Sequence, residues 1–242
     1  MEAIRIENLR KVYKDVVAVD GLSLTVQKGE LFSLLGVNGA GKTTTIKMLS
    51  GLTQPSSGDA VLLGNSITKD ISRVKSIIAV SPQETAIAPG LTVEENLELI
   101  CSIHGFSKEK RKEKIGELAS LLGLASVMGK KAGKLSGGWQ RRLSIAMALI
   151  GEPEILFLDE PTLGLDVLAR SDLWDLIRSL KSKITIILTT HYMEEAEALS
   201  DRIAIMAEGK LLICDTAENI KRKTDTDNFE QAFIRIVKEA QK

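Results

Sequence analysis

The sequence predicts an α/β fold in which a parallel sheet carries a phosphate-binding loop. Residues 36–44 fit the pattern G-x-x-x-x-G-K-[ST] and lie between an apolar run at 31–35 and a helical stretch at 45–49. Two more short apolar runs, at 155–158 and 184–188, are typical of strands buried in a parallel sheet. Helical spacing of apolar residues over 167–177 lies between them, so strands and helices alternate along the chain.

Composition limits the classes of protein that the chain can represent. Its 242 residues, 44% hydrophobic and 26% charged, suit one large or two small soluble globular domains. A formal net charge of +0 and 4% aromatic residues argue against a nucleic-acid partner. Cys101 and Cys214 lie far apart, which indicates two reduced thiols. We see no run of eighteen apolar residues and no signal peptide, so we expect any membrane role to be peripheral.

The N-terminal part of the chain predicts strands on either side of the loop. Alternation of apolar and polar residues at 4–7 and 22–26 predicts two half-buried strands. The third strand, 31–35, feeds the phosphate loop. Further short strands are expected at 60–63 and 77–80.

The middle of the chain predicts a helical insert at about residues 90–150. Thr92 and Glu95 form a capping box that starts a first helix. A second helix begins at Ser107, and its lysine-rich first turns indicate a solvated face. A third follows Gly138 and ends near Gly151.

After the insert, the α/β pattern resumes and ends in a short tail. We expect a helix at 193–199 and a hairpin of strands 203–206 and 211–214 around Glu208-Gly209. The tail, about residues 216–242, is polar until a docking helix marked by Phe229, Phe233 and Ile236.

The phosphate loop predicts a nucleotide site with a defined chemistry. Its glycines let backbone N–H groups point at phosphate oxygens, and the helix that follows adds positive potential. Lys42 would reach the β- and γ-phosphates, and the Thr43 hydroxyl would hold Mg²⁺. The expected nucleotide-binding residues of the loop are Gly36, Asn38, Gly39, Ala40, Gly41, Lys42, Thr43 and Thr44.

Two carboxylates follow the apolar strand at 155–158. Asp159, at the carboxyl end of a parallel strand opposite the loop, can hold the Mg²⁺ of a nucleotide. Glu160 beside it can position or deprotonate an attacking water. An acidic strand end alone can simply cap the next segment, but the phosphate loop favours the catalytic interpretation.

Six motifs in order make the chain resemble the ATP-binding-cassette (ABC) ATPases over almost its whole length. Besides the phosphate loop they are Tyr13 as the adenine-stacking aromatic, Gln83 of the Q-loop, the signature Leu135-Ser136-Gly137-Gly138, the joined Walker B and D-loop from Asp159 to Asp166, and the switch residue His191. The resemblance implies a RecA-like parallel core, an N-terminal antiparallel β subdomain and the helical insert, as one ABC ATP-binding domain over 1–242.

The resemblance also implies roles for the motif residues. Glu160 would be the general base, with Lys42, Gln83 and His191 also catalytic; Thr43, Gln83 and Asp159 would hold Mg²⁺. ATP would contact the loop, Tyr13, Asp166 and the signature residues Ser136, Gly137 and Gly138. The signature would face the γ-phosphate bound by another subunit, which implies a head-to-tail dimer.

Two residues depart from the common family pattern. Val37 stands where proline is frequent, and we expect little effect because the loop acts through backbone amides. Trp139 stands where glutamine is frequent after the paired glycines, so no side-chain role is carried over there.

The expected function is that of the ATP-hydrolysing subunit of an ABC transporter at the cytoplasmic face of the membrane. Residues 189–202 and 228–233 resemble the bacterial multidrug, sodium and polysaccharide export branch. The partners would be a separate membrane permease and a second copy or homologous ATPase subunit, without nucleic acid. The alternative is a soluble single-cassette ATPase, such as an iron–sulfur assembly ATPase. A GTPase is disfavoured because the chain has no N-K-x-D motif.

Overall fold

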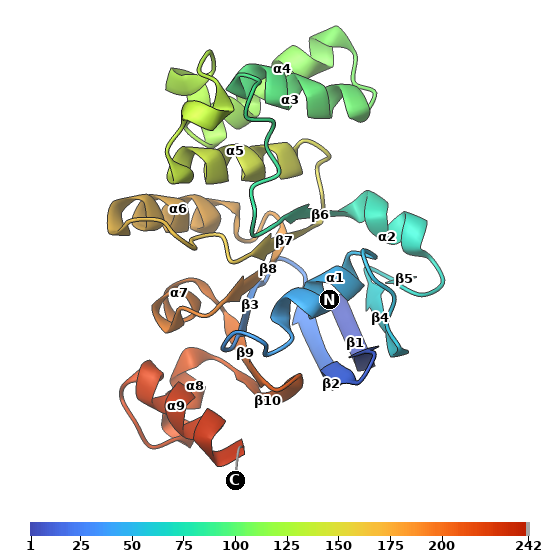
Figure 1. Ribbon diagram of the computed structural model, residues 1–242, viewed down its shortest axis with the longest axis vertical. Coiled ribbons are helices and arrows are strands. Elements are labelled where there is room, and N and C mark those ends of the chain that lie inside the picture. Colours follow the sequence, from blue (N-terminus) through green and yellow to red (C-terminus); the bar gives the residue numbers. More distant parts are fainter. Residues whose placement is uncertain (241–242) are drawn as a thin grey trace.

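Two sheets packed around one helix form the lower part of the molecule, and a helical subdomain stands above them (Figure 1). The computed structural model describes residues 1–240. The larger sheet is six-stranded, in the order β10-β9-β3-β8-β7-β6. Its strands are β3 (Leu31–Leu35), β6 (Ile78–Ser81), β7 (Ile155–Asp159), β8 (Thr185–Thr190), β9 (Arg202–Ala207) and β10 (Lys210–Asp215).

Parallel pairing places the carboxyl ends of the central strands at one edge of this sheet. β3 pairs in parallel with β8 and β9, and β7 pairs in parallel with β6 and β8. Only β10, the second strand of the predicted hairpin, is antiparallel, and Glu208 and Gly209 form its turn with positive φ. The parallel core predicted from the sequence is confirmed, and the motif loops after β3, β6, β7 and β8 lie together.

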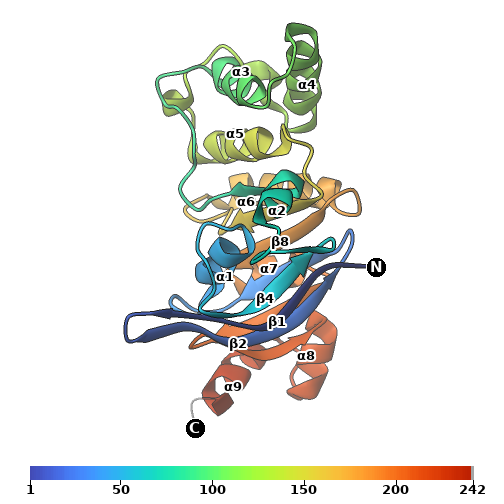
Figure 2. The same cartoon turned by 90° about the vertical axis from the view of Figure 1, so that its right-hand side faces the viewer.

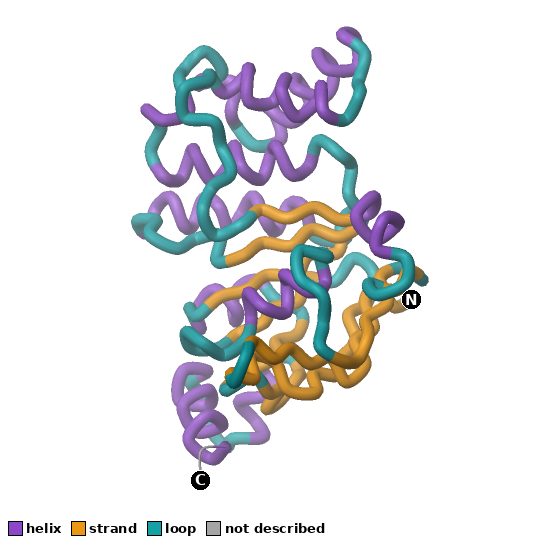
Figure 3. Tube along the Cα trace, turned by 45° about the vertical axis from the view of Figure 1, so that its right-hand side comes forward, coloured by secondary structure: helices purple, strands orange, loops and turns teal. Residues whose placement is uncertain are grey.

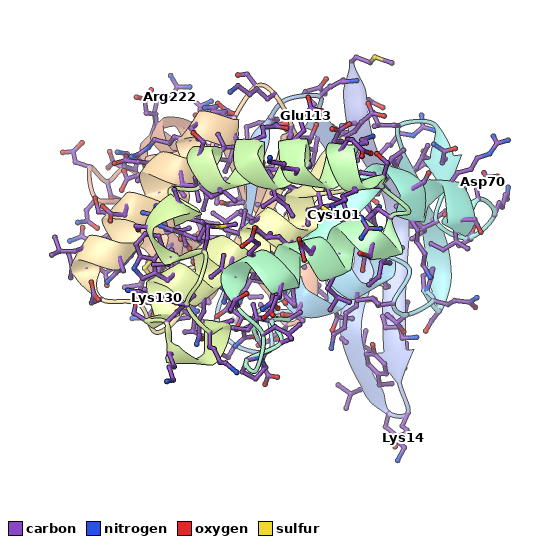
Figure 4. All side chains as sticks on the ribbon, turned by 90° about the horizontal axis from the view of Figure 1, so that it is seen from above. Lys14, Asp70, Cys101, Glu113, Lys130 and Arg222 are labelled. Carbon is purple, nitrogen blue, oxygen red and sulfur yellow. The ribbon has the colours of Figure 1, made fainter. Side chains whose placement is uncertain are left out.

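The smaller sheet is antiparallel, with strand order β2-β1-β4-β5, as the sequence predicts for the N-terminal part. Its strands are β1 (Glu2–Tyr13), β2 (Val16–Gln27), β4 (Ser57–Leu62) and β5 (Asn65–Ser66). β1 and β2 form a long hairpin that extends beyond the rest of the sheet (Figure 2). Lys14 marks its tip when the molecule is seen from above (Figure 4).

Helix α1 (Lys42–Leu49) is packed between the two sheets. Ile46, Met48 and Leu49 share a core with Phe157 of β7 and with residues of β1, β2 and β4. Because strand side chains alternate between faces, the neighbours of Phe157 in β7 point the other way. Leu156 and Leu158 pack with the helical layer of α5 (Gly137–Leu149) and α6 (Val167–Leu180).

The helical subdomain consists of α3 (Val93–Ile103), α4 (Lys108–Leu121), two short 3₁₀ helices (Leu124–Val127 and Ala132–Lys134) and α5. The tube in Figure 3 shows helices joined by loops at this end of the molecule, while the strands lie below. The predicted capping box is confirmed, since Thr92 Oγ1 accepts from the Glu95 amide and the Glu95 carboxylate accepts from the Thr92 amide. In Figure 4, buried Cys101 is labelled on α3 and exposed Glu113 on α4.

The remaining helices flank the large sheet: α2 (Ile71–Ile77), α7 (Met193–Leu199), α8 (Ala217–Lys223) and α9 (Phe229–Ala240). The sequence pattern does not predict α2 or α8, and the polar segment after Thr216 is in part helical rather than irregular. Thr216 caps α8 by accepting from the Asn219 amide. The docking helix is confirmed as α9, and its residues Phe229 and Phe233 are buried. Within residues 1–240, no helix combines the length and apolar character needed to cross a membrane.

Candidate nucleotide-binding and hydrolytic site

The phosphate loop leaves a strand whose five residues, Leu31–Leu35, are all buried. Gly39 and Gly41 adopt positive φ of 84° and 98°, a conformation that glycine reaches without strain. Gly41 is also restricted by space, because a Cβ there would lie 2.5 Å from the backbone oxygen of Ala18 in β2. The loop therefore requires glycine where the N-terminal hairpin presses on it.

Lys42, the first residue of α1, folds back over the loop. Its Nζ donates to the carbonyl oxygens of Gly36 at 2.7 Å and Val37 at 3.3 Å, and lies 3.6 Å from Glu160 Oε1. The residue is only 5% exposed. Burial lowers the pKa of Lys42, because the charged form loses water, and the carboxylate of Glu160 opposes that shift.

Two of the three predicted metal ligands, on different motifs, lie side by side. Thr43 Oγ1 on α1 donates to Asp159 Oδ1 at the end of β7, at 3.1 Å. Thr189 on β8 holds the same Asp159 oxygen from the other side. A hydroxyl next to a carboxylate is the donor set of a Mg²⁺ that is otherwise held by phosphates and water. Within the described residues no cluster of three or more His, Cys, Asp or Glu side chains could hold a metal ion.

Glu160 lies between the phosphate-loop lysine and the switch histidine. Its Oε2 lies 2.9 Å from His191 Nδ1, while its Oε1 faces Lys42. The backbone of Glu160 has φ of 45°, a left-handed conformation that is uncommon outside glycine. Two bonds hold it there, from the Glu160 amide to the carbonyl and the hydroxyl of Thr189.

A single pocket of about 600 Å³ collects most of the predicted residues. Gln83, Glu160 and His191 line it from three strand ends, together with Asn38, Gly39, Ala40, Gly41, Lys42, Thr43 and Thr44 of the loop. Gly36 forms the base of the loop through its bond to Lys42. The site therefore unites residues more than 150 positions apart in the sequence, because parallel strands end at one edge.

The signature residues lie outside this pocket. Ser136 directly precedes α5 and is exposed, and with Gly138 it lines a separate cavity of about 100 Å³. The paired glycines let α5 approach the D-loop, since a Cβ on Gly137 would lie 3.3 Å from Leu165 and one on Gly138 would lie 3.1 Å from Ala169. One chain thus holds the phosphate loop and the signature at different places.

The predicted roles of Tyr13 and Asp166 stay predictions. Tyr13, at the end of β1, is 44% exposed and does not line the pocket, and Lys11 Nζ lies 4.9 Å from its ring centre. Asp166 caps α6, where its Oδ1 accepts from the Ala169 amide at 2.9 Å.

Sequence reasoning missed several residues at the site. Val16, Val17 and Ala18 of β2 line the pocket beside the loop, yet they lie outside the predicted strand at 22–26 and in no predicted motif. Thr189 holds both Asp159 and Glu160, and its position directly before the switch motif was the available signal. The pairing of β8 with β7 brings it there, which local sequence does not reveal.

The geometry combines a phosphate-loop pocket with a carboxylate–histidine pair beside the loop lysine. The family model described as "ABC transporter" matches residues 19–163, more than half of the chain. A second model, described as "AAA domain, putative AbiEii toxin, Type IV TA system", matches the shorter segment 131–196. The chain belongs to the ABC transporter family and is an ABC ATPase domain.

Curated relatives and solved structures agree with this assignment. The chain is 42% identical over 91% of its length to "Phospholipid-transporting ATPase ABCA3" of Homo sapiens, of which it spans 13%. It is 38% identical over 97% of its length to "Probable multidrug ABC transporter ATP-binding protein YbhF" of Escherichia coli (strain K12), of which it spans 41%. The chain therefore spans less than half of these two relatives.

Two solved structures extend the likeness to the fold. One is an ATP-binding subunit of an ABC transporter, with a TM-score of 0.85 and 26% identity; the match covers 97% of this chain and 99% of that one. The other is a dimeric post-hydrolysis ATP-binding cassette bound to ADP and Pi, with a TM-score of 0.79 and 26% identity; the match covers 88% and 98%. The predicted ABC ATPase fold is confirmed.

Proposed function

We propose that the chain hydrolyses Mg²⁺–ATP and that two cassettes close head to tail on ATP to drive export through a membrane permease. The observation that carries the proposal is the position of Glu160, with one oxygen facing Lys42 and the other bonded to His191. A water at the γ-phosphate would meet a carboxylate that is already oriented. The relatives' printed names, a phospholipid-transporting ATPase and a probable multidrug transporter protein, support a transport role.

Each group in the pocket has a distinct task. The loop amides and Lys42 bind the β- and γ-phosphates and offset the charge that develops during transfer. Glu160 accepts the proton of the attacking water, and His191 orients Glu160 and contacts the γ-phosphate. Thr43 and Asp159, with Gln83, would hold Mg²⁺, which would supply positive charge to offset the negative charge of the phosphates.

The dimer and the membrane partner belong to the same proposal. Ser136, Gly137 and Gly138 lie outside the pocket of their own chain and would complete the pocket of a second subunit. Exposed Val167 and Leu168, at 72% and 79%, lie beside this face and suit burial between subunits. We place the assembly at the cytoplasmic face of the membrane, held by a permease that would contact the surface between Gln83 and the helical subdomain. The whole of residues 1–242 would act as one domain.

The test of this function is the variant Glu160→Gln, which removes the base but keeps the phosphate contacts. We expect ATP hydrolysis to fall by about a hundredfold or more, with ATP binding kept. Size-exclusion chromatography with ATP and Mg²⁺ should show a species of doubled mass. Glu113→Gln, on the exposed face of α4, is the matched control and should hydrolyse ATP normally. Normal hydrolysis by Glu160→Gln would contradict the assignment of the base.

The transport role needs a separate observation. A gene for a six-helix membrane protein next to the gene of this chain, and co-purification of the two products from membranes, would support it. A soluble iron–sulfur assembly ATPase would instead co-purify with soluble partners. Neither result depends on the chemistry of Glu160.

A further inference from the structure

Arg141, in the second turn of α5, contacts the segment that carries Gln83. Its Nη1 donates to the carbonyl oxygen of Pro82 and its Nη2 to that of Gln83, both at 2.6 Å. The planar guanidinium presents its N–H groups as a fork, and here two of them hold two successive carbonyls. The sequence motifs do not indicate this contact, because the acceptors are backbone atoms.

A second contact lies one turn further along the same helix. Ser144 is three residues after Arg141 and therefore on the same face of α5. Its hydroxyl lies 3.0 Å from that of Ser81, and both serines are buried, at 4% and 0% exposed. Three successive residues, 81–83, are thus fastened along one face of the helix that begins with the signature.

The contact keeps a charge buried without an ion pair. Arg141 is 4% exposed, and among residues 1–240 it forms no salt bridge; its carboxylate neighbours, Asp159 and Glu195, act on it only through their charge. Burial lowers the pKa of Arg141, while the more distant charges of Asp159 and Glu195 act against this. A guanidinium remains protonated in proteins. The helix therefore keeps a costly buried cation whose direct partners are the two carbonyls.

The neighbouring arginine shows that the orientation is specific. Arg142 points away from the Gln83 segment and contacts the carbonyl of Leu122 and the carboxylate of Asp172. Simple anchoring of the helix to its surroundings is already provided by Arg142 and by the apolar side chains of α5. Arg141 adds a connection to one segment, and that segment carries a residue of the nucleotide pocket.

We propose that Arg141 is a positioning residue that couples the γ-phosphate to the signature. When Gln83 moves toward the phosphate and metal, the carbonyls of Pro82 and Gln83 move with it. Through their hydrogen bonds they pull the Arg141 guanidinium and displace α5. The signature residues 136–138 at the start of that helix then move with it toward the partner subunit. This inference rests on the proposed role of Gln83. The two hydrogen bonds are the physical link, and the bound nucleotide supplies the displacement.

Three variants test the link. Arg141→Met removes both bonds while keeping much of the side-chain volume, and Arg141→Lys retains one donor group. Arg111→Met is the matched control, because Arg111 also donates to a backbone carbonyl of the helical subdomain, that of Phe106 at 2.8 Å, but does not touch the Gln83 segment. Circular dichroism and thermal unfolding establish that each variant is folded.

The kinetic readout separates coupling from nucleotide binding. We expect Arg141→Met to lower kcat for ATP by about tenfold, while the Kd for ATP measured on the monomer stays within about twofold. Arg141→Lys should recover part of kcat, and Arg111→Met should match the wild type. A merely structural role would instead weaken binding and folding together.

The second readout is hydrogen exchange with a non-hydrolysable β,γ-imido analogue of ATP and Mg²⁺. In the wild type the analogue should slow exchange of the amides of residues 141–149. These residues follow the signature at the start of α5, so a partner subunit that covers the signature would not protect them directly. In Arg141→Met this nucleotide-dependent difference should disappear.

Gln83→Ala distinguishes a failure of the coupling through Arg141 from a failure of the proposed role of Gln83. If Gln83→Ala lowers kcat and Arg141→Met leaves both kcat and the exchange difference unchanged, the coupling is refuted and the proposed function stands. If Gln83→Ala hydrolyses ATP normally, the proposed role of Gln83 fails and the coupling fails with it.

Discussion

The phosphate-loop side of this cassette is internally complete, whereas its signature face is not. On the first side, Thr43 is already bonded to Asp159, and Glu160 already contacts both Lys42 and His191. On the second, Ser136 is exposed, its side chain makes no capping bond, and it faces a separate small cavity. The difference teaches that the fold of one chain can arrange the first region by itself, whereas under the proposed head-to-tail assembly a second subunit would complete the other.

The largest effect should come from the complete side. Lys42→Ala removes the cation that faces the transferred phosphoryl group and also the two bonds that fasten the loop. We expect ATP hydrolysis to fall by about a hundredfold or more, measured as phosphate release under saturating ATP. Turnover within about twofold of wild type would show that this pocket is not where hydrolysis occurs.

The next effect should come from the incomplete side, and it should depend on assembly. Ser136→Arg places bulk and charge on the exposed face, so hydrolysis should fall by about a hundredfold while the monomer still binds ATP. Fluorescent-nucleotide titration measures that binding. Loss of ATP binding by a folded Ser136→Arg monomer would place Ser136 in the pocket of its own chain.

A mixture of the two inactive variants makes the comparison sharper. In a mixed dimer of Lys42→Ala and Ser136→Arg, one composite site contains both changes and the other contains neither. We expect partial recovery of ATP hydrolysis when the two are mixed at equal concentration, because one intact site is formed. Ser136→Arg protein alone is the control. Both composite sites of its dimer contain the altered signature, so its ATP hydrolysis should not recover.

A smaller effect is expected at the base of the nucleotide. The sequence shows no motif that would form hydrogen bonds with the edge of the nucleotide base, so GTP should partly replace ATP. If Tyr13 stacks on the base, Tyr13→Ala should weaken both nucleotides by about 1–3 kcal/mol, or roughly 5- to 150-fold in Kd. Val17→Ala, in the same hairpin, is a useful comparison because Val17 does line the pocket. A preference for ATP of several hundredfold would point to an unrecognised hydrogen-bonding group.

The smallest effect should come from a carboxylate outside both regions. Bonds from Lys223, Asn219 and the Thr216 amide lower the pKa of Asp215 from 3.8 to about 2. The folded-state pKa is depressed, so the contribution to stability is present above the ordinary pKa and is lost as pH falls toward 2. Because Asp215 is near the surface, Asp215→Asn should cost less than about 1 kcal/mol, a Tm change of at most about 2–4 °C. That difference should vanish at low pH, with hydrolysis unchanged at neutral pH.

Sequence was most informative where chemistry requires a fixed order of residues. The pattern from Gly36 to Thr44 places a lysine, a hydroxyl and several backbone amides within one turn of chain, and the structure brings them to one pocket. Local signals also predicted the capping box at Thr92 and the hairpin at Glu208-Gly209. In each of these cases the physical cause lies within a few residues.

Contacts between distant segments could not be predicted in this way. Arg141 holds carbonyls about 60 positions earlier in the chain, and backbone acceptors carry no mark in the sequence. Val16 and Val17 reach the pocket only because the hairpin of β1 and β2 extends past its sheet. The helix α8 was missed because Ala217–Lys223 is short and polar, and its position depends on a cap and on buried Ile220.

The left-handed backbone at Glu160 has a consequence for how far this protein can be stabilised. A residue with a Cβ pays roughly 1–2 kcal/mol in that conformation, and glycine would relieve the strain. Such a replacement would discard the carboxylate that faces Lys42 and His191. Under the proposed role of Glu160 as the base, selection for a more stable fold and selection for turnover would favour different residues at this position. A cassette that no longer hydrolyses ATP would then be free to replace the glutamate.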